Sequence, residues 1–150
     1  MSWQNKNRKG ETVMKQVLSV EQMRHLRELG VDTSGASLTW MLYPYEEGKQ
    51  AELSLRKYST FKEPFRKEHC VPAFTLQDIV DLVLKEMKSY PDTYCLTISI
   101  CDCKEWSVYY SVSDEFDCYE EFRSESLIGA AYEMLCWCIE NGYVGKEETE

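Results

Sequence analysis

The sequence lacks the features that mark several common classes of protein. No apolar run approaches the roughly 20 residues that span a membrane, and the polar residues 1–16 have no apolar core like that of a signal peptide. Only two histidines are present, and no Walker loop, G-x-S-x-G, G-x-G-x-x-G or H-E-x-x-H motif occurs. These absences predict a soluble, cytoplasmic protein without membrane contact, and they favour binding over catalysis.

An excess of basic residues is also missing. The chain has 17 lysines and arginines against 26 aspartates and glutamates, which gives a net charge of -9. The acidity belongs to the C-terminal third, because residues 102–150 hold thirteen acidic residues against only Lys104, Arg123 and Lys146. Nonspecific affinity for DNA or RNA requires a basic surface, so we expect no direct binding to nucleic acid.

The seven cysteines form an odd-numbered set in a chain with no export signal, and several lie within apolar patterns. Reduced and mostly buried thiols are therefore expected. Cys101 and Cys103 are weak candidates for a zinc site, because the usual C-x2-C spacing is absent and other side chains would have to complete the ligand set. We predict no metal site and no cofactor.

One long apolar helix pattern, at residues 124–142, dominates what is present. Ser124 or Ser126 can cap its start, and Asn141-Gly142 supplies a left-handed stop. The residues between them are apolar around more than half of the helix circumference. Such a wide arc predicts contact with a sheet on one side and with another helix or subunit on the other.

Two further helices are predicted from capping pairs. Ser19 with Gln22 and Thr75 with Asp78 have the spacing of capping boxes. The apolar stripe after Ser19 predicts a helix that Gly30 ends, and the stripe after Thr75 predicts a helix that continues through Met87.

Four strands are predicted in two hairpins, at residues 38–43 with 51–56 and 95–100 with 106–112. The element order is then α-ββα-ββα. It predicts an α+β fold in which the two hairpins form one four-stranded antiparallel sheet, with the helices packed on one face. The expected organisation is an N-terminal tail, a single domain and an acidic C-terminal tail, at residues 1–17, 18–143 and 144–150.

Two stretches are candidate binding surfaces. Residues 58–74 mix aromatic and basic side chains, as sites for single-stranded nucleic acid do, but the overall negative charge favours an acidic protein surface, including that of a second copy. In the acidic loop 114–122, aromatic residues would anchor a partner and carboxylates would orient it. The candidate residues are Tyr58, Phe61, Lys62, Phe65, Arg66, Lys67, Asp114, Glu115, Phe116, Asp117, Tyr119, Glu120 and Glu121.

Three segments, SVEQMRHLRELGVDTSGAS, FTLQDIVDLV and ESLIGAAYEMLCWCIENGY, together resemble a group of small uncharacterised proteins encoded by gut Bacteroidales and by their phages and integrated elements. The resemblance spans most of residues 19–143. The resemblance depends mostly on two segments, the first helix with the Gly-Val-Asp-Thr-Ser that follows it and the Trp-Cys-Ile-Glu-Asn-Gly-Tyr at the end of the last helix. It implies a bacterial cytoplasmic setting and a mobile-element origin, and it supplies no activity, cofactor or catalytic residue.

Three functions remain open from the sequence. The first is a non-catalytic protein-binding or accessory module, which would include self-association because the central helix is apolar nearly all round. The second is an acidic regulator or anti-defence protein of a mobile element, which blocks a nucleic-acid-binding partner by imitating phosphate charge. The third is a small enzyme that uses His69, Cys70 and loop carboxylates. No motif identifies the partner.

Overall fold

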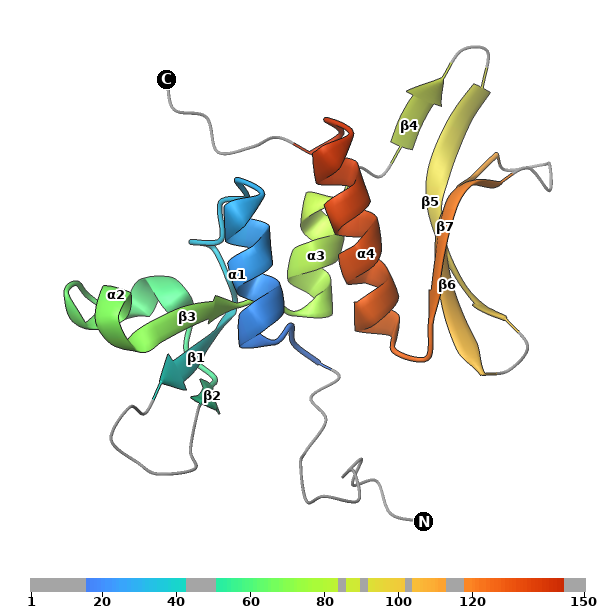
Figure 1. The fold of residues 1–150 in the computed structure, drawn as a ribbon. Helices are drawn as coiled ribbons and strands as arrows, with labels where there is room; N and C mark the ends of the chain where they lie inside the picture. Colours follow the sequence, from blue (N-terminus) through green and yellow to red (C-terminus); the bar gives the residue numbers. More distant parts are fainter. Residues whose placement is uncertain are drawn as a thin grey trace.

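Helices and strands are mixed along the chain of this computed structural model, which describes residues 16–42, 51–83, 86–89, 92–101, 104–112 and 118–144. The α+β class predicted from the sequence is confirmed (Figure 1). Within these ranges, no helix is long and apolar enough to cross a membrane. The elements are α1 (Val20–Glu28), β1 (Leu38–Leu42), β2 (Ala51–Ser54), the 3-10 helix η1 (Tyr58–Thr60), α2 (Phe65–His69), β3 (Cys70–Ala73), α3 (Leu76–Leu82), β4 (Glu86–Ser89), β5 (Asp92–Cys101), β6 (Glu105–Ser111), β7 (Cys118–Ser124) and α4 (Leu127–Glu140).

The strands form two separate antiparallel sheets, so the prediction of one sheet built from both hairpins is wrong. The first hairpin joins β3 in the order β2-β1-β3, with Trp40 opposite both Leu53 and Val71. The second hairpin lies between two other strands, in the order β4-β5-β6-β7. Each hairpin therefore pairs with strands close to it in sequence. Strand β3 pairs with β1, and β4 and β7 pair with β5 and β6. These edges of the hairpins therefore cannot also bond to the other hairpin.

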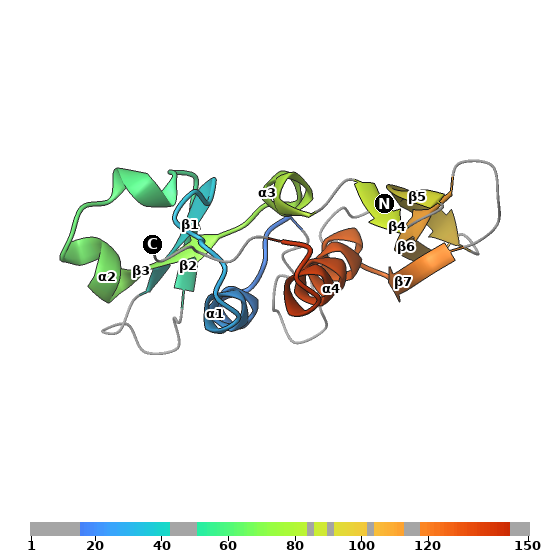
Figure 2. The ribbon, with the colours of Figure 1, turned by 90° about the horizontal axis from the view of Figure 1, so that it is seen from above.

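Helices α1, α3 and α4 form a layer between the two sheets. Seen from above, they occupy the middle of the molecule, with the three-stranded sheet on one side and the four-stranded sheet on the other (Figure 2). Helix α4 packs on β6, β7 and α3, while α1 packs on β3. Buried side chains from all three helices and both sheets belong to one apolar cluster, so a single core connects the layers.

Helix α4 is buried on two sides, as its wide apolar arc predicts. The hydroxyl of Ser126 caps its start by accepting a hydrogen bond from the backbone N–H of Gly129 at 3.2 Å, and Gly142 follows its end at a φ of +78°. The adjacent residues Met134 and Leu135 are both fully buried, although they point about 100° apart around the helix. The four-stranded sheet and α3 both contact α4, so the chain itself provides two covering surfaces for this helix.

Both predicted capping boxes are present. The backbone N–H of Gln22 donates to the hydroxyl of Ser19 at 3.1 Å, and the N–H of Ser19 donates to the side chain of Gln22 at 2.9 Å. Thr75 and Asp78 make the same exchange at 3.2 and 2.9 Å. Helix α3 nevertheless ends at Leu82 rather than beyond Met87, because Glu86–Ser89 pairs with β5 as a strand.

Strands β3 and β7 occupy segments where the sequence favours irregular structure. Strand β3 contains Pro72, which an edge strand can accommodate, and among the described strands β3 pairs with β1 alone. Strand β7 carries Glu120 and Glu121, and charged residues are common at such edges. Leu55, which follows the end of β2 at Ser54, is 83% exposed.

We predict that Leu135→Ala lowers the free energy of unfolding by about 2–5 kcal/mol, because it removes a fully buried side chain and leaves a cavity around α4. Glu133→Ala, at an exposed position of the same helix, should change it by less than about 0.5 kcal/mol. Urea denaturation followed by circular dichroism measures both values. Equally small effects would contradict the central position of α4.

Candidate functional site

The predicted aromatic and basic stretch forms a short, structured connection of the three-stranded sheet. The chain leaves β2, passes through η1 and α2, and returns as β3, which pairs with β1 (Figure 1). The backbone N–H of Tyr58 donates to the carbonyl oxygen of Ala36 at 3.2 Å, which ties η1 to the segment before β1. Six of the predicted residues lie here, and we call them the η1–α2 surface: Tyr58, Phe61, Lys62, Phe65, Arg66 and Lys67.

A row of rings runs along α2. The ring centroids of Phe61 and Phe65 lie 6.1 Å apart with the planes at 27°, and those of Phe65 and His69 lie 5.0 Å apart. Phe65 and His69 are four residues apart within α2, so they lie on the same side of this helix. Phe61 lies before α2, at the end of η1, and stacks on Phe65 from there. Phe65 nevertheless keeps 45% of its surface exposed. The row is therefore ordered by its own contacts and still presents an apolar face to solvent.

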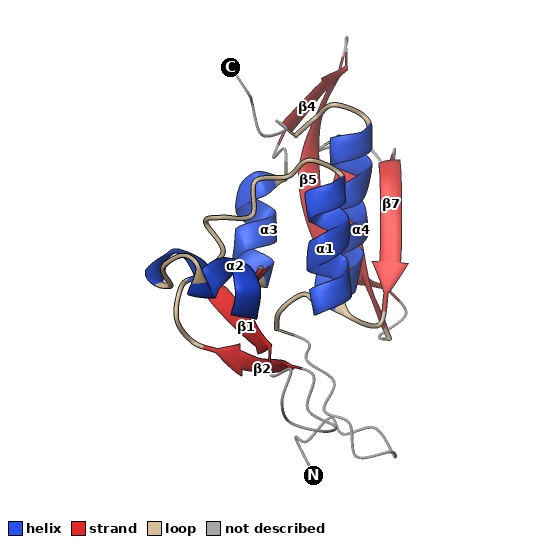
Figure 3. Ribbon diagram, turned by 60° about the vertical axis from the view of Figure 1, so that its left-hand side comes forward, coloured by secondary structure: helices blue, strands red, loops and turns tan. Residues whose placement is uncertain are grey.

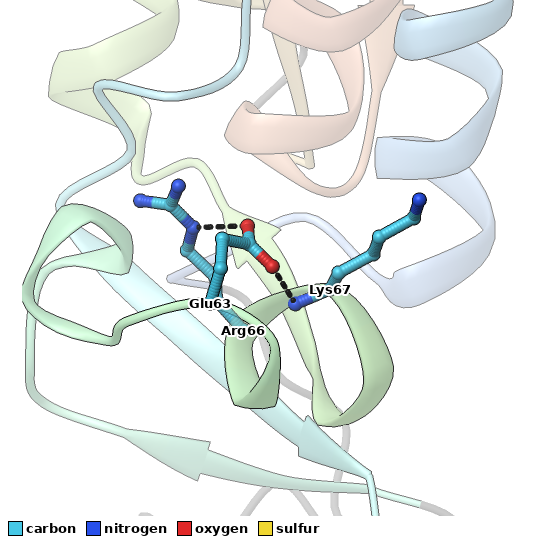
Figure 4. A network of polar contacts seen from close by, with 3 residues as sticks. All are labelled: Glu63, Arg66 and Lys67. Carbon is cyan, nitrogen blue, oxygen red and sulfur yellow. Dashed lines mark hydrogen bonds and ion pairs between the residues drawn. The ribbon is translucent and has the colours of Figure 1, made fainter.

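Glu63 arranges the basic side chains of this surface. Its carboxylate accepts hydrogen bonds from Nε of Arg66 at 2.9 Å and from the backbone N–H of Lys67 at 3.1 Å (Figure 4). The guanidinium carbon of Arg66 lies 5.3 Å from the centroid of the Tyr58 ring, a cation–π contact. The ammonium group of Lys67 points away from Glu63 (Figure 4). One basic group is thus fixed in place, and the other extends from the surface.

The contact with Arg66 also sets the acidity of Glu63. The hydrogen bond from the Arg66 side chain is the main influence that holds the pKa of this carboxyl below its ordinary value, and the Lys67 N–H adds to it. A carboxyl whose pKa falls on folding stabilises the folded state above its ordinary pKa. That stabilisation is lost as the pH falls through the lowered value, so an ionised Glu63 organises the surface at neutral pH.

His69 and Cys70 are not arranged as a catalytic pair. Nε2 of His69 lies 3.8 Å from a carboxylate oxygen of Glu68, while the thiol of Cys70 donates to the sulfur of Met41 at 3.8 Å. Burial is the main cause that raises the pKa of the Cys70 thiol, which disfavours the nucleophilic thiolate at neutral pH. This geometry offers no support for an enzyme that uses these two residues.

The acidic candidates lie on a different part of the molecule. Tyr119, Glu120 and Glu121 belong to β7, in the four-stranded sheet, across the helical layer from α2 (Figure 2). The Ser107 hydroxyl donates to the carboxylate of Glu121 and is the main influence that lowers its pKa, with a smaller contribution from Arg123. Within one chain, Glu120 and Glu121 are therefore apart from the η1–α2 surface. The remaining predicted residues lie outside the described ranges: Asp114, Glu115, Phe116 and Asp117.

The described cysteines are free thiols in varied surroundings. Cys70 and Cys138 are buried, and Cys95 is exposed. Of the weak zinc candidates, Cys101 is half-buried at the end of β5, and Cys103 lies outside the described residues. Among the side chains that the structure describes, no group of three or more histidine, cysteine, aspartate or glutamate residues could hold a metal ion.

A groove lies where α1, α4 and β7 meet, and Glu120 is the one predicted binding residue among its lining residues. Its volume is about 480 Å³, and we call it the α4 groove. Helix α4 lies beside α1 and β7 (Figure 3), and the ring of His25 on α1 is 6.4 Å from that of Tyr132 on α4 in a T-shaped contact. The α4 pattern was visible in the sequence, but no local signal shows that α1 and β7 flank it. The groove is lined by His25 of α1, by Glu120 and Phe122 of β7, and by five residues of α4: Tyr132, Glu133, Cys136, Trp137 and Glu140.

Comparisons with known proteins assign no family to the chain. No protein-family model, no curated protein and no solved structure matches it. The resemblance carried by the three segments therefore stays a prediction, and the function has to be argued from the geometry of the two surfaces.

We predict that Arg66→Gln raises the pKa of Glu63 towards its ordinary value, because it removes the charged donor that holds the pKa down. A carbon-13 NMR titration of the Glu63 carboxyl measures the change directly. Arg24→Gln, on α1, removes the same charge at an exposed site outside this surface and should leave the Glu63 pKa where it is. An unchanged pKa in Arg66→Gln would show that the contact does not persist in solution.

Proposed function

We propose that this protein is a non-catalytic protein-binding module and that the η1–α2 surface is its binding site. The observation that carries the proposal is Phe65, which stays 45% exposed although the rings of Phe61 and His69 flank it. Aromatic side chains near the centre of an interface commonly supply a large part of the binding energy. A ring that its neighbours already hold in place loses little conformational entropy when a partner binds.

The surface rests on a rigid base, which suits recognition. Strand β3 starts directly after α2, and all four of its residues are buried. The N–H of Tyr58 ties η1 to Ala36, and Glu63 bonds Arg66 and the backbone of Lys67. Functional residues are often carried on connecting segments that a rigid scaffold positions. The η1–α2 surface has this arrangement.

The proposed partner presents an acidic surface with an apolar centre. Lys62 and Lys67 are exposed and lie on either side of Phe65 in the sequence, and basic groups at the rim of an interface mainly steer and orient an acidic partner. Leu55, just before η1 in the chain, adds a further exposed apolar side chain. The apolar residues would supply most of the affinity, and the lysines would set the orientation.

The proposed setting is a bacterial cytoplasm, with the protein acting as an accessory factor of a mobile element. This part of the proposal is supported by the resemblance of the three segments alone.

A second candidate is the acidic charge mimic that blocks a nucleic-acid-binding protein. It is supported by Glu120, Glu133 and Glu140, which line one groove in the acidic third of the chain.

We predict that Phe65→Ala weakens partner binding about tenfold or more, as the loss of an aromatic hot spot does. The immobilised protein is used to capture partners from a bacterial lysate, and quantitative mass spectrometry compares the wild type with the variant. Ile100→Ala is the matched control, since it removes an exposed apolar side chain from β5 instead. A partner retained equally by wild type and Phe65→Ala would contradict the proposed site.

Charge and salt separate the two candidate functions. Lys62→Glu/Lys67→Glu should reduce capture through the η1–α2 surface, whereas Arg24→Glu/Lys104→Glu makes the same change in net charge at exposed sites elsewhere. Binding anchored on Phe65 should persist at high salt, because apolar burial is not screened. A partner lost steeply with added salt but indifferent to Phe65→Ala would favour the charge mimic.

A further inference from the structure

The α4 groove contains an aromatic cluster. Phe122 of β7 and Tyr132 and Trp137 of α4 are all half-buried and line it. The ring of Trp137 stacks on that of Tyr143, with centroids 5.3 Å apart, which fixes its orientation. Half-buried rings that line an open groove are in position to contact whatever enters it. Burial is the main cause that raises the pKa of Cys136, which lies among them, so this thiol stays neutral.

Three carboxylates surround these rings. Glu133 and Glu140 are seven residues apart on α4, so they lie on the same side of the helix, separated by about 10.5 Å along its axis. Glu120 comes from β7, where the pairing with β6 is irregular and its φ is +71°. All three residues are exposed. Among the described residues that line the groove, none is a lysine or an arginine.

This arrangement suits a long organic cation better than a metal ion. Oxygen ligands bind calcium or magnesium at roughly 2.0–2.6 Å, and side chains two helical turns apart are poorly placed to share one ion. Lysine and arginine carry an apolar stem below the charged group, and aromatic faces attract such cations. A volume of about 480 Å³ lies within the range of roughly 300–1,000 Å³ seen for binding pockets.

We propose that the α4 groove binds a lysine or arginine side chain that projects from a partner protein. Tyr132 and Trp137 contact the stem and the cation, and Glu120, Glu133 and Glu140 balance its charge. The aromatic walls and the three carboxylates match a cationic occupant, and His25, whose ring contacts that of Tyr132, completes the lining on the α1 side. The groove shares no residue with the η1–α2 surface, so this proposal holds or fails independently of binding at that surface.

The test uses a capped peptide of four lysine-glycine repeats as the probe, with the full-length protein labelled with nitrogen-15. We expect saturable NMR shifts at the backbone of residues 132–140 and at the Trp137 indole. The same peptide with norleucine in place of lysine keeps the methylene stem and lacks the charge. It should bind about tenfold more weakly or worse, because both the cation–π contact and the ion pairs are lost.

Matched variants identify the groups responsible. Glu133→Gln/Glu140→Gln should weaken binding about threefold to tenfold, while Glu21→Gln/Glu125→Gln removes the same charge outside the groove and should leave it unchanged. Tyr132→Leu should weaken binding, and Tyr132→Phe should retain it because the ring remains. The urea midpoint of each variant, measured in parallel, shows whether it is folded.

Three results would overturn the proposal. Binding of the norleucine peptide as tight as that of the lysine peptide would show a purely apolar groove. Unsaturable shifts spread over acidic residues throughout the chain would show nonspecific attraction to the negative protein. Light scattering could detect self-association in the wild type and none in Glu133→Gln/Glu140→Gln. That result would assign the groove to a second copy of this chain instead of a separate partner.

Discussion

The fold depends on the burial of α4 on two sides at once. Met134 and Leu135 are both fully buried because the four-stranded sheet and α3 both pack on this helix. The hydroxyl of Tyr110, on β6, lies in the same core and pairs with the thiol of Cys138 at 3.3 Å, as a buried polar group requires. Burial is also the main cause that raises the pKa of Tyr110, so it stays neutral. Each sheet can be small because the helical layer supplies a core that both share.

The same helical layer keeps the two candidate surfaces apart. The η1–α2 surface extends from the three-stranded sheet, and the acidic side chains of β7 lie across the helices on the four-stranded sheet (Figure 2). The negative charge of the C-terminal third is therefore also concentrated in one part of the structure, because β6, β7 and α4 all come from that third. The η1–α2 surface and the α4 groove are separate parts of the molecule, so the two proposed interactions would not compete.

The candidate sites differ in how far the sequence revealed them. The mixture of Phe61, Phe65 and Arg66 in one irregular stretch was enough to nominate the η1–α2 surface. The sequence did not show the role of Glu63, whose carboxylate orders Arg66 and the turn of α2, because an acidic residue among basic ones has no distinctive pattern. Of the residues that line the α4 groove, the sequence nominated only Glu120, since the groove is formed by three elements that only packing brings together.

Residue type and spacing were enough to predict the local interactions. The boxes at Ser19 and Thr75 and the two hairpins were predicted correctly, and Ser126 is the cap among the two serines proposed, because the partners are close in the chain and their geometry follows from residue type. Which strands share a sheet depends instead on contacts between distant segments. Helix α3 stops early and the next segment becomes β4 because β5 offers a free edge, and β3 and β7 become strands against β1 and β6 despite a proline and several charges. Edge strands draw their stability from the neighbour to which they bond, and that neighbour cannot be read from their own residues.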